Sequence, residues 1–254
     1  MRVHKPPRMA NAKFVALFYG LTDTGKTYLL GSAQDCPETS PTLFIDIDGG
    51  TLTLAGQDIH VVAPKNFAEL QEVYDFLRED NDVYKSVCLD SLTAQQRDMS
   101  MPTVLGELDE DQALTDLSRS KPPTQRDWLA SGHQMRQLLQ AFRGLAKSGP
   151  ARRRIHVFAS AGERVDERRD LGVPALPGVL GTEVGGYVDT LARLVSVTPT
   201  ERNKKEVRYL YTMKHLEDDG FVYLGKNRRR LLPRRVKDPS VSKLIRYWQR
   251  ESAG

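Results

Sequence analysis

One short segment of the chain has the residue types and spacing of a phosphate-binding loop. Gly20, Gly25, Lys26 and Thr27 occupy the fixed positions of the pattern G-x-x-x-x-G-K-[ST], directly after an apolar run at residues 14–19. In such a loop backbone N–H groups point at phosphate oxygens, the lysine reaches the β- and γ-phosphates, and the threonine hydroxyl binds Mg²⁺. The segment predicts a nucleotide site, with a chance Gly-rich turn as the alternative. The expected nucleotide contacts are Gly20, Leu21, Thr22, Asp23, Thr24, Gly25, Lys26, Thr27 and Tyr28.

A carboxylate at the end of an apolar strand is the best candidate to complete the magnesium site. The strand expected over residues 84–90 ends in Asp90. A buried strand that ends in aspartate is the Walker B arrangement, in which the carboxylate lies near the Mg²⁺ held by Thr27. The alternative is an aspartate that only caps the next turn. With a phosphate-binding loop upstream, the sequence favours Thr27 and Asp90 as metal ligands.

Two further aspartates, Asp46 and Asp48, end the strand expected over residues 42–48. Phosphoryl transfer to water needs a group that orients or deprotonates the attacking water. Side chains alternate along a strand, so both carboxylates lie on one face if the strand is regular, and either could serve. The alternative for one of them is a capping role in the turn at Gly49-Gly50.

The elements that must position these residues alternate between strands and helices in the first 160 residues. This alternation predicts an α/β fold with a mainly parallel central sheet flanked by helices. Strands 207–213 and 221–224 should form a C-terminal antiparallel hairpin through the Asp-Gly turn at 217–220. The other expected strands are 14–19, 42–48, 59–63, 84–90, 155–160 and 191–197. The expected helices are 25–33, 66–77, 125–147 and one after Ser240, with Asn66, Thr124 and Ser240 as N-caps.

Composition places the chain among ordinary globular proteins, with 254 residues, 39% hydrophobic residues and 28% charged residues. That length fits one α/β domain, expected over residues 13–254 after a flexible basic arm at 1–12. No apolar stretch is long enough to span a bilayer, and the N-terminus lacks the apolar core of a secretory signal. The two cysteines, Cys36 and Cys88, indicate neither a disulfide framework nor a zinc site, which favours a cytoplasmic location.

Positive charge is concentrated toward the C-terminal part of the sequence. Residues 68–118 contain 13 acidic and 3 basic side chains, whereas residues 202–250 contain 15 basic and 5 acidic ones. The segment 226–237 alone has seven lysines and arginines and no acid. This asymmetry indicates a nucleic-acid surface or head-to-tail contact between subunits, and an ordinary solvated surface is the alternative.

Several motifs in a fixed order give residues 13–248 a resemblance to RecA-like P-loop ATPases. Phe44-Ile45-Asp46-Ile47-Asp48 is similar to the recombinase strand that ends in the catalytic glutamate, with Asp48 at the position of that glutamate. Gly225-Lys226-Asn227-Arg228 resembles the segment that these ATPases insert across a subunit interface toward the neighbour's γ-phosphate. The stretches that more narrowly resemble phage-encoded RecA-like proteins of single-strand annealing and recombination are Val87-Cys88-Leu89-Asp90-Ser91-Leu92-Thr93, Leu176-Pro177-Gly178, and Lys226-Asn227-Arg228 with Leu232-Pro233.

The resemblance implies a Mg²⁺-dependent ATPase that acts on single-stranded DNA in recombination, annealing or replication. Its active site would be completed by a neighbouring subunit. Lys26 and Asp48 would be catalytic in one subunit, while Lys226 and Arg228 of the next neutralise charge on the γ-phosphoryl group. The alternative for these cations is contact with nucleic-acid phosphates or solvent. The resemblance also implies a homo-oligomer, ring or filament, with a single-strand binding protein or other recombination proteins as partners, in the host cytoplasm if phage-encoded.

Two stretches correspond to the DNA-facing loops of RecA-like proteins, residues 94–123 and 162–178. The first is polar and acidic from residue 98 and should be a surface excursion; the second should be a long loop without an aromatic residue for base stacking. The sequence departs from the recombinases at Ser160-Ala161, where they usually have a glutamine that senses the γ-phosphate. The expected DNA contacts are Arg164, Arg168, Arg169, Arg229 and Arg230.

Two other functions fit the phosphate-binding loop. One is a P-loop kinase for a nucleotide or small molecule, in which the late arginines close over the phosphates. The absence of an arginine-bearing lid near the middle of the sequence argues against it. The other is an ATP-switched DNA-binding or annealing module with little turnover, since Asp48 is shorter than the glutamate whose position it takes.

Overall fold

The central sheet of the protein is mainly parallel, in a computed structural model that describes residues 12–106, 122–148, 150–197 and 206–250. Its strands are β1 (Val15–Tyr19), β2 (Thr42–Asp46), β3 (His60–Val62), β4 (Ser86–Asp90), β5 (His156–Ala161), β8 (Thr190–Val197), β9 (Val207–Tyr211), β12 (Lys226–Asn227) and β13 (Arg235–Lys237). Their order is β13-β9-β8-β1-β5-β4-β2-β3, with β12 paired to β8 off this path. From β8 to β3 neighbouring strands run parallel, whereas β9, β12 and β13 pair antiparallel. The predicted α/β class with a mainly parallel central sheet is confirmed, and the C-terminal strands are antiparallel as expected.

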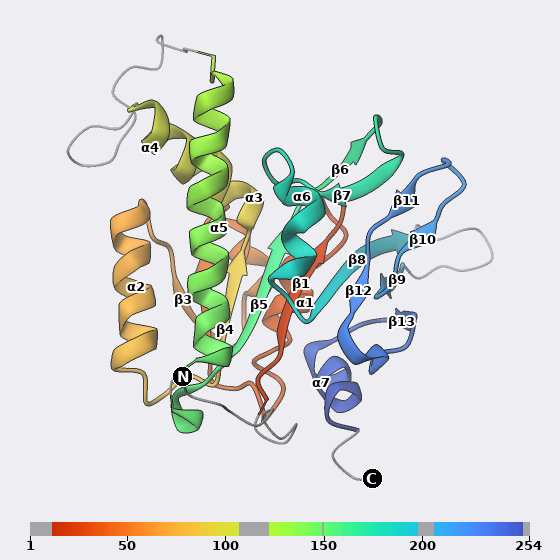
Figure 1. The fold of residues 1–254 in the computed structure, drawn as a ribbon. Coiled ribbons are helices and arrows are strands. Elements are labelled where there is room, and N and C mark those ends of the chain that lie inside the picture. Colours follow the sequence, from red (N-terminus) through yellow and green to blue (C-terminus); the bar gives the residue numbers. More distant parts are fainter. Residues whose placement is uncertain (1–11, 107–121, 149, 198–205, 251–254) are drawn as a thin grey trace, which may run out of the picture.

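A smaller sheet lies beside the main one (Figure 1). It contains β6 (Glu163–Asp166), β7 (Leu171–Pro174), β10 (His215–Leu216) and β11 (Val222–Tyr223), in the order β10-β11-β7-β6. The helices that the structure describes are α1 (Lys26–Gly31), α2 (Phe67–Glu79), α3 (Leu92–Ala94), α4 (Met101–Leu105), α5 (Gln125–Lys147), α6 (Leu180–Glu183) and α7 (Val241–Gln249). Shorter or irregular turns are η2 (Gly50–Leu54), η3 (Gln95–Ser100), η4 (Ala151–Arg153), η5 (Val184–Gly186) and η6 (Arg228–Arg230).

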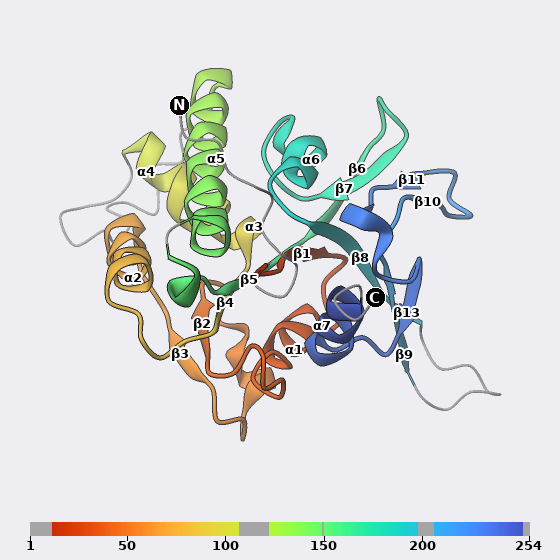
Figure 2. The same cartoon turned by 60° about the horizontal axis from the view of Figure 1, so that its bottom comes forward.

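Helices cover both faces of the main sheet, as Figures 1 and 2 show. On one face Val15, Leu17 and Tyr19 of β1 belong to the apolar cluster that α2 and α5 complete. On the other face Ala16 and Phe18 belong to the cluster that α1 and α7 complete. A strand covered on both faces needs apolar side chains at every position, which is why the sequence of β1 is an unbroken apolar run.

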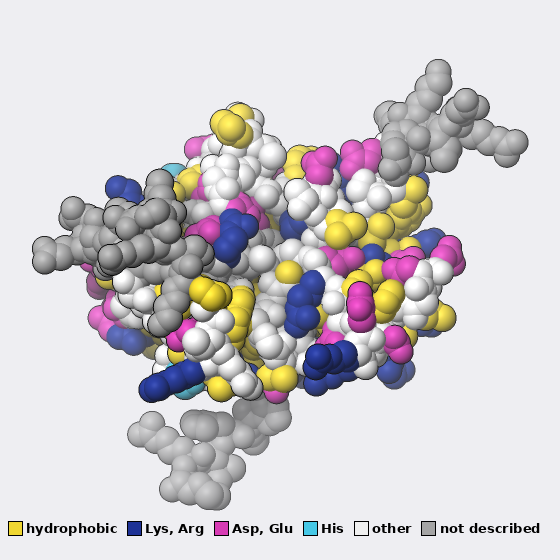
Figure 3. All heavy atoms as spheres, turned by 90° about the horizontal axis from the view of Figure 1, so that it is seen from above, with side chains coloured by type: hydrophobic (Ala, Val, Ile, Leu, Met, Phe, Trp, Pro, Cys, Tyr) yellow, Lys and Arg dark blue, Asp and Glu magenta, His cyan; other side chains and the backbone are white. Residues whose placement is uncertain are grey.

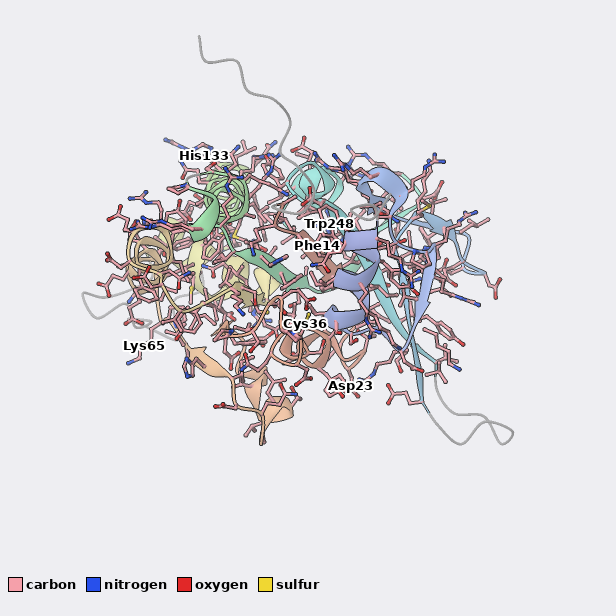
Figure 4. The ribbon with its side chains drawn as sticks, turned by 90° about the horizontal axis from the view of Figure 1, so that it is seen from below. Phe14, Asp23, Cys36, Lys65, His133 and Trp248 are labelled. Atoms are coloured by element: carbon pink, nitrogen blue, oxygen red, sulfur yellow. The ribbon has the colours of Figure 1, made fainter. Side chains whose placement is uncertain are left out.

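The N-cap residues expected from the sequence begin three of the helices. Asn66, Thr124 and Ser240 each accept a hydrogen bond from the backbone N–H three residues further on, at the starts of α2, α5 and α7. In α7 the ring of Trp248 lies against Phe14, with ring centroids 4.5 Å apart (Figure 4). This contact fixes the C-terminal helix on the face of the sheet that α1 also covers.

Two expectations about the connecting segments are wrong, and a third, the surface excursion at 98–123, lies mostly outside the described residues. The stretch 162–178 is not a continuous loop, because β6 and β7 pair as an antiparallel hairpin within it. The stretch 98–123 begins with helical turns, η3 and α4, and residues 107–121 lie outside the described part. Strands 207–213 and 221–224 do not pair with each other: β9 pairs with β8 and β13, and β11 pairs with β10 and β7. The turn at 217–220 instead joins β10 to β11, while β9 joins the main sheet through β8 and β13.

The other boundaries lie within two residues of those predicted, and α5 begins and ends as expected at Gln125 and Lys147. The expected basic arm at 1–12 lies outside the described residues except for Ala12. No helix in the described part of the chain is long and apolar enough to cross a membrane.

Candidate nucleotide-binding site

The phosphate-binding loop joins β1 to α1 at the carboxyl edge of the sheet. Gly25 precedes α1 with a φ of 87°, a left-handed conformation that favours glycine. The loop lines a pocket of about 780 Å³ that also receives residues from η2, the end of β4 and β9. Lys26 Nζ donates to the carbonyl oxygens of Gly20 (3.1 Å) and Leu21 (2.7 Å). Burial lowers the pKa of Lys26, and nearby carboxylates, Asp90 first, oppose that shift.

The predicted nucleotide contacts divide into those that line this pocket and those that shape the loop behind it. The lining residues among them are Thr22, Asp23, Gly25, Lys26, Thr27 and Tyr28. Thr24 instead closes the loop, since its hydroxyl donates to the carbonyl oxygen of Leu21 (2.9 Å). Gly20 and Leu21 present their carbonyl groups to the ammonium group of the loop lysine.

Asp90, the last residue of β4, lies between two hydroxyl donors. Thr27 Oγ1 donates to Asp90 Oδ2 (2.5 Å), and Ser160 Oγ, near the end of β5, donates to Asp90 Oδ1. Burial raises the pKa of this carboxyl, the two hydroxyl donors oppose the rise, and the neighbouring Asp48 and Asp46 add to it. The structure thus brings Thr27 and Asp90 together as the sequence predicts. Ser160, at the position of the recombinase glutamine, holds the carboxylate in place.

The two aspartates expected at the end of the second strand have different surroundings. Asp46 is the last residue of β2 and accepts hydrogen bonds from Gly49 N (2.9 Å), Gly50 N (3.2 Å) and Thr51 Oγ1 (2.7 Å). It is buried and holds the turn, whereas Asp48 is exposed and lines the nucleotide pocket. The condition for both to share one strand face, a regular strand as far as residue 48, is not met, because the chain leaves the strand after Asp46.

Three oxygens in the pocket converge near Gly50 in η2. A Cβ placed on Gly50 would lie 3.1 Å from Asp48 Oδ1 and 3.3 Å from Thr27 Oγ1. It would lie 3.8 Å from Asp90 Oδ2. Carboxylate and hydroxyl oxygens are ligands that Mg²⁺ takes together with phosphates and water. The residues present therefore fit Mg²⁺, with Thr27 and Asp90 as the ligands from this chain and Asp48 beside them.

Arg208, on β9, enters the pocket although no sequence pattern points to it. Its guanidinium lies against the loop, since a Cβ on Gly25 would be 2.7 Å from Cζ of Arg208. The same group lies 5.4 Å from the ring centroid of Tyr28 and 3.5 Å from a carboxylate oxygen of Glu206. Antiparallel pairing of β9 with β8, in the register Ser196 opposite Arg208, brings it there. No local sequence pattern marks a single arginine in a strand as a pocket residue, so the sequence did not predict Arg208.

The residues predicted to act in a neighbouring site lie away from this pocket within one chain. β12 pairs with the amino-terminal end of β8, whereas the loop follows the carboxyl end of β1. Lys226 Nζ donates to the carbonyl oxygens of Gly185 and Val188, the latter at 3.0 Å. Arg228 Nε lies 3.5 Å from Asp189 Oδ1. The structure therefore brings neither side chain to the phosphate-binding loop of its own chain.

The five arginines predicted to contact DNA fall into two groups. Arg164, Arg168 and Arg169 lie on β6 and in the turn after it, and line one groove. Arg229 and Arg230 lie in η6, directly after β12, with φ of 69° and 55°. These two do not line that groove.

A family model described as an AAA domain matches residues 12–228 of the chain. The matched part contains the phosphate-binding loop, Asp90 and Ser160, and it ends at Arg228. No curated protein matches the sequence.

Several solved structures are similar to this chain at low sequence identity. The RadB recombinase is 15% identical, with 85% of this chain and 92% of that chain covered and a TM-score of 0.44. The flagellar accessory protein FlaH from Methanocaldococcus jannaschii is 9% identical, with 91% and 88% covered and a TM-score of 0.37. An ATPase from the type III secretion system of pathogenic bacteria is 15% identical, with 72% and 51% covered and a TM-score of 0.46. At these identities and scores the similarity does not extend to activity or partners.

Proposed function

We propose that this chain, which belongs to the AAA domain family and is therefore a P-loop ATPase domain, hydrolyses ATP on single-stranded DNA during recombination, annealing or replication. The observation that carries the ATPase part of the proposal is the 2.5 Å contact between Thr27 and Asp90 beside the phosphate-binding loop. It joins the two residues that a P-loop ATPase needs around Mg²⁺, although they stand 63 positions apart.

The residues of one chain bind and orient the nucleotide. The backbone N–H groups of the loop surround the phosphates, and Lys26 exchanges its loop carbonyl partners for phosphate oxygens. Arg208 supplies a second cation from the same subunit, next to Gly25. Thr27 and Asp90 would hold Mg²⁺, which would supply charge neutralisation on the nucleotide's phosphates.

Hydrolysis also needs an oriented water and a cation for the charge that develops on the γ-phosphoryl group. Asp48, exposed at the pocket, orients the water and accepts its proton. Lys226 and Arg228 of a neighbouring subunit supply the positive charge. Their position away from the loop of their own chain supports a site shared between subunits of a homo-oligomer.

Single-stranded DNA contacts arginines on the surface beside β6. Of the predicted contacts, Arg168 and Arg169 are exposed and Arg164 is partly so. Arg229 and Arg230 in η6, beyond the amino-terminal end of β8, are proposed as a separate set of phosphate contacts. A backbone that carries one phosphate per nucleotide binds such cations without regard to sequence, and more weakly as salt increases.

The test measures ATP hydrolysis with and without single-stranded DNA for the wild type, Lys26→Ala, Arg228→Ala and the matched control Arg246→Ala, an exposed arginine on α7. We expect DNA to stimulate the wild type and the control. The other two variants should lose about 10²-fold or more of turnover. Arg228→Ala should still bind ATP and fold, because Lys147 remains 2.7 Å from Asp189 as its partner.

Mixing Lys26→Ala with Arg228→Ala tests the shared site. Some interfaces in the mixture combine an intact loop with an intact Arg228, so part of the activity should return. If DNA does not change the rate of ATP hydrolysis at any salt concentration in the tested range, the DNA part of the proposal is overturned. ATP consumption by monomers with a small acceptor and no DNA would instead identify a kinase, and annealing that survives Lys26→Ala would identify an ATP-switched module.

A further inference from the structure

A second cavity opens between the helices that follow β4 and the β6–β7 hairpin. It has a volume of about 820 Å³ and is lined by α3, η3, α4 and the start of α5 on one side. On the other side it is lined by β6, the turn after it and residues 175–179. Figure 3 views the molecule from this side and shows Lys and Arg side chains next to hydrophobic ones. We name this cavity the Trp128 groove.

The charged side chains of the Trp128 groove are mostly positive. Its lining contains four arginines and one acid, Asp166. Two of the arginines pair with acids. Arg169 lies 3.4 Å from Asp166, and Arg97 pairs with Asp98, which does not line the groove. Arg164 donates to the carbonyl oxygen of Gly178 (2.9 Å), and no ion pair in the described residues engages Arg168. The excess of positive charge favours a polyanionic ligand.

Trp128 supplies the flat aromatic surface that the 162–178 segment lacks. It lies in the first turn of α5, and its side chain lines the groove although the residue is 44% exposed. The capping box between Thr124 and Asp127 fixes this first turn, so the ring is carried on an ordered helix end. Exposed tryptophan beside arginines is the combination that binds unpaired bases, because every base has a π-face and every nucleotide a phosphate.

We propose that the Trp128 groove binds single-stranded nucleic acid by stacking a base on the indole of Trp128 while Arg164 and Arg168 contact the adjacent phosphates. This inference rests on the proposed function and adds to it a binding surface and a base-stacking residue. Bases in a duplex are already stacked and paired, so the groove selects single strands over duplexes.

The groove and the nucleotide pocket share part of one wall. Thr93 and Arg97 line both of them. Thr93 Oγ1 accepts from Gly162 N and donates to the carbonyl oxygen of Ala175, each at 2.9 Å. Thr93 thus ties the end of the Asp90 strand to both flanks of the β6–β7 hairpin. A nucleic-acid strand bound in the groove would contact residues that also line the nucleotide pocket. This shared wall would link DNA binding to the rate of ATP hydrolysis.

Intrinsic fluorescence tests the proposal, because the chain has two tryptophans and Trp248 is only 3% exposed, in the core. Titration with an oligothymidylate should quench the wild-type fluorescence, and Trp128→Phe should bind the strand with that quenching lost. Trp128→Ala should bind about 5- to 150-fold more weakly, the usual range for one stacked base. An abasic oligonucleotide of the same length should bind wild type and Trp128→Ala equally.

Two controls separate stacking from charge and from damage to the helix. Leu129→Ala removes a 66% exposed apolar side chain next to Trp128 that does not line the groove, and should leave affinity unchanged. Arg168→Ala should keep the quenching and reduce the slope of log affinity against log salt by about 0.7.

The anisotropy of a labelled strand and the ATPase rate are measured on the same samples, so that failures can be told apart. If the strand binds and stimulates the ATPase without quenching the fluorescence, the inference is overturned and the proposed function stands. The same holds if the strand binds wild type and Trp128→Ala with equal affinity. No binding of the strand at all would overturn both. Quenching with the expected loss in Trp128→Ala, but without ATP hydrolysis, would support the groove and overturn the ATPase.

Discussion

At the residue scale, the side chain of Asp90 is held by two hydroxyl donors. Its two carboxylate oxygens accept from different elements, Thr27 in α1 and Ser160 in β5. Both donors stabilise the charged form of a carboxyl whose pKa burial raises. We therefore infer that Ser160 acts through Asp90, as a positioning residue that favours the charged form of the proposed metal ligand.

Replacing Ser160 with alanine should raise the pKa of Asp90 further, because one donor to the carboxylate is lost while the burial remains. A protonated Asp90 is a poor ligand for Mg²⁺, so the acid limb of the pH profile of ATP hydrolysis should move to higher pH. The free energy of unfolding should also fall by ~1–3 kcal/mol, the usual effect of leaving a buried polar group short of a partner. A pH–rate profile and denaturant unfolding measure the two effects.

The matched control is Ser86→Ala, at the opposite end of β4. Ser86 is as buried as Ser160 and donates to the carbonyl oxygen of Thr39 (2.8 Å), far from the nucleotide pocket. It should lose comparable stability without a shift in the pH profile. Equal profiles for Ser160→Ala and the wild type would show that Ser160 has only a packing role.

At the scale of elements, buried polar contacts fix the start of β1 against its neighbours. The backbone N–H of Phe14 donates to Nδ1 of His156 in β5 (3.1 Å), and that of Val15 donates to Asp189 (3.1 Å). An acceptor Nδ1 requires the neutral imidazole. Burial lowers the pKa of His156 to about 3, and Lys13 and Lys147 add to the shift.

This histidine should make the protein acid-sensitive in a defined pH range. Above pH 6.5 the ring is neutral in both folded and unfolded chains, so the full stability is present. As the pH falls toward 3, the unfolded chain binds a proton that the folded chain excludes, and the free energy of unfolding should fall by ~1.4 kcal/mol per pH unit. Denaturant unfolding between pH 7 and pH 4 measures the slope.

His156→Asn should flatten this slope, since an amide oxygen can accept from the same N–H without titrating. The control is His133→Asn, which removes an exposed histidine on α5 (Figure 4) and should keep the wild-type slope. If His156→Asn had the same slope as the wild type, other groups would have to account for the acid sensitivity.

At the scale of the whole molecule, the two halves of the proposed active site lie at different places on one chain. The phosphate-binding loop lies at the carboxyl edge of the sheet, while β12 with Lys226 pairs at the amino-terminal end of β8. The catalytic roles proposed for Lys226 and Arg228 therefore require a second subunit.

We therefore expect the ATPase rate per subunit to rise with protein concentration and to reach a plateau once assembly is complete. Steady-state turnover across a dilution series, with sedimentation velocity on the same samples, measures this. Arg228→Ala should remain slow at every concentration. A rate per subunit that stays constant where sedimentation shows only monomers would rule out a shared site.

The sequence by itself determined the features that depend on neighbouring residues. The phosphate-binding pattern, the apolar run of β1 and the N-caps at Asn66, Thr124 and Ser240 are local, because loop geometry and helix capping involve residues a few positions apart. The alternation of strands and helices likewise sufficed for the α/β class and for Asp90 at a strand end. The catalytic and DNA-contact roles assigned to single residues remain predictions.

The tertiary structure decided which distant side chains meet. Insertion of β5 between β1 and β4 places Ser160 on Asp90, 70 positions away, and the pairing of β9 with β8 carries Arg208 to the loop. The sequence likewise did not predict the β6–β7 hairpin or the position of Trp128 opposite it. Strand order and register depend on how whole apolar faces pack together, so no local pattern of residue types encodes them.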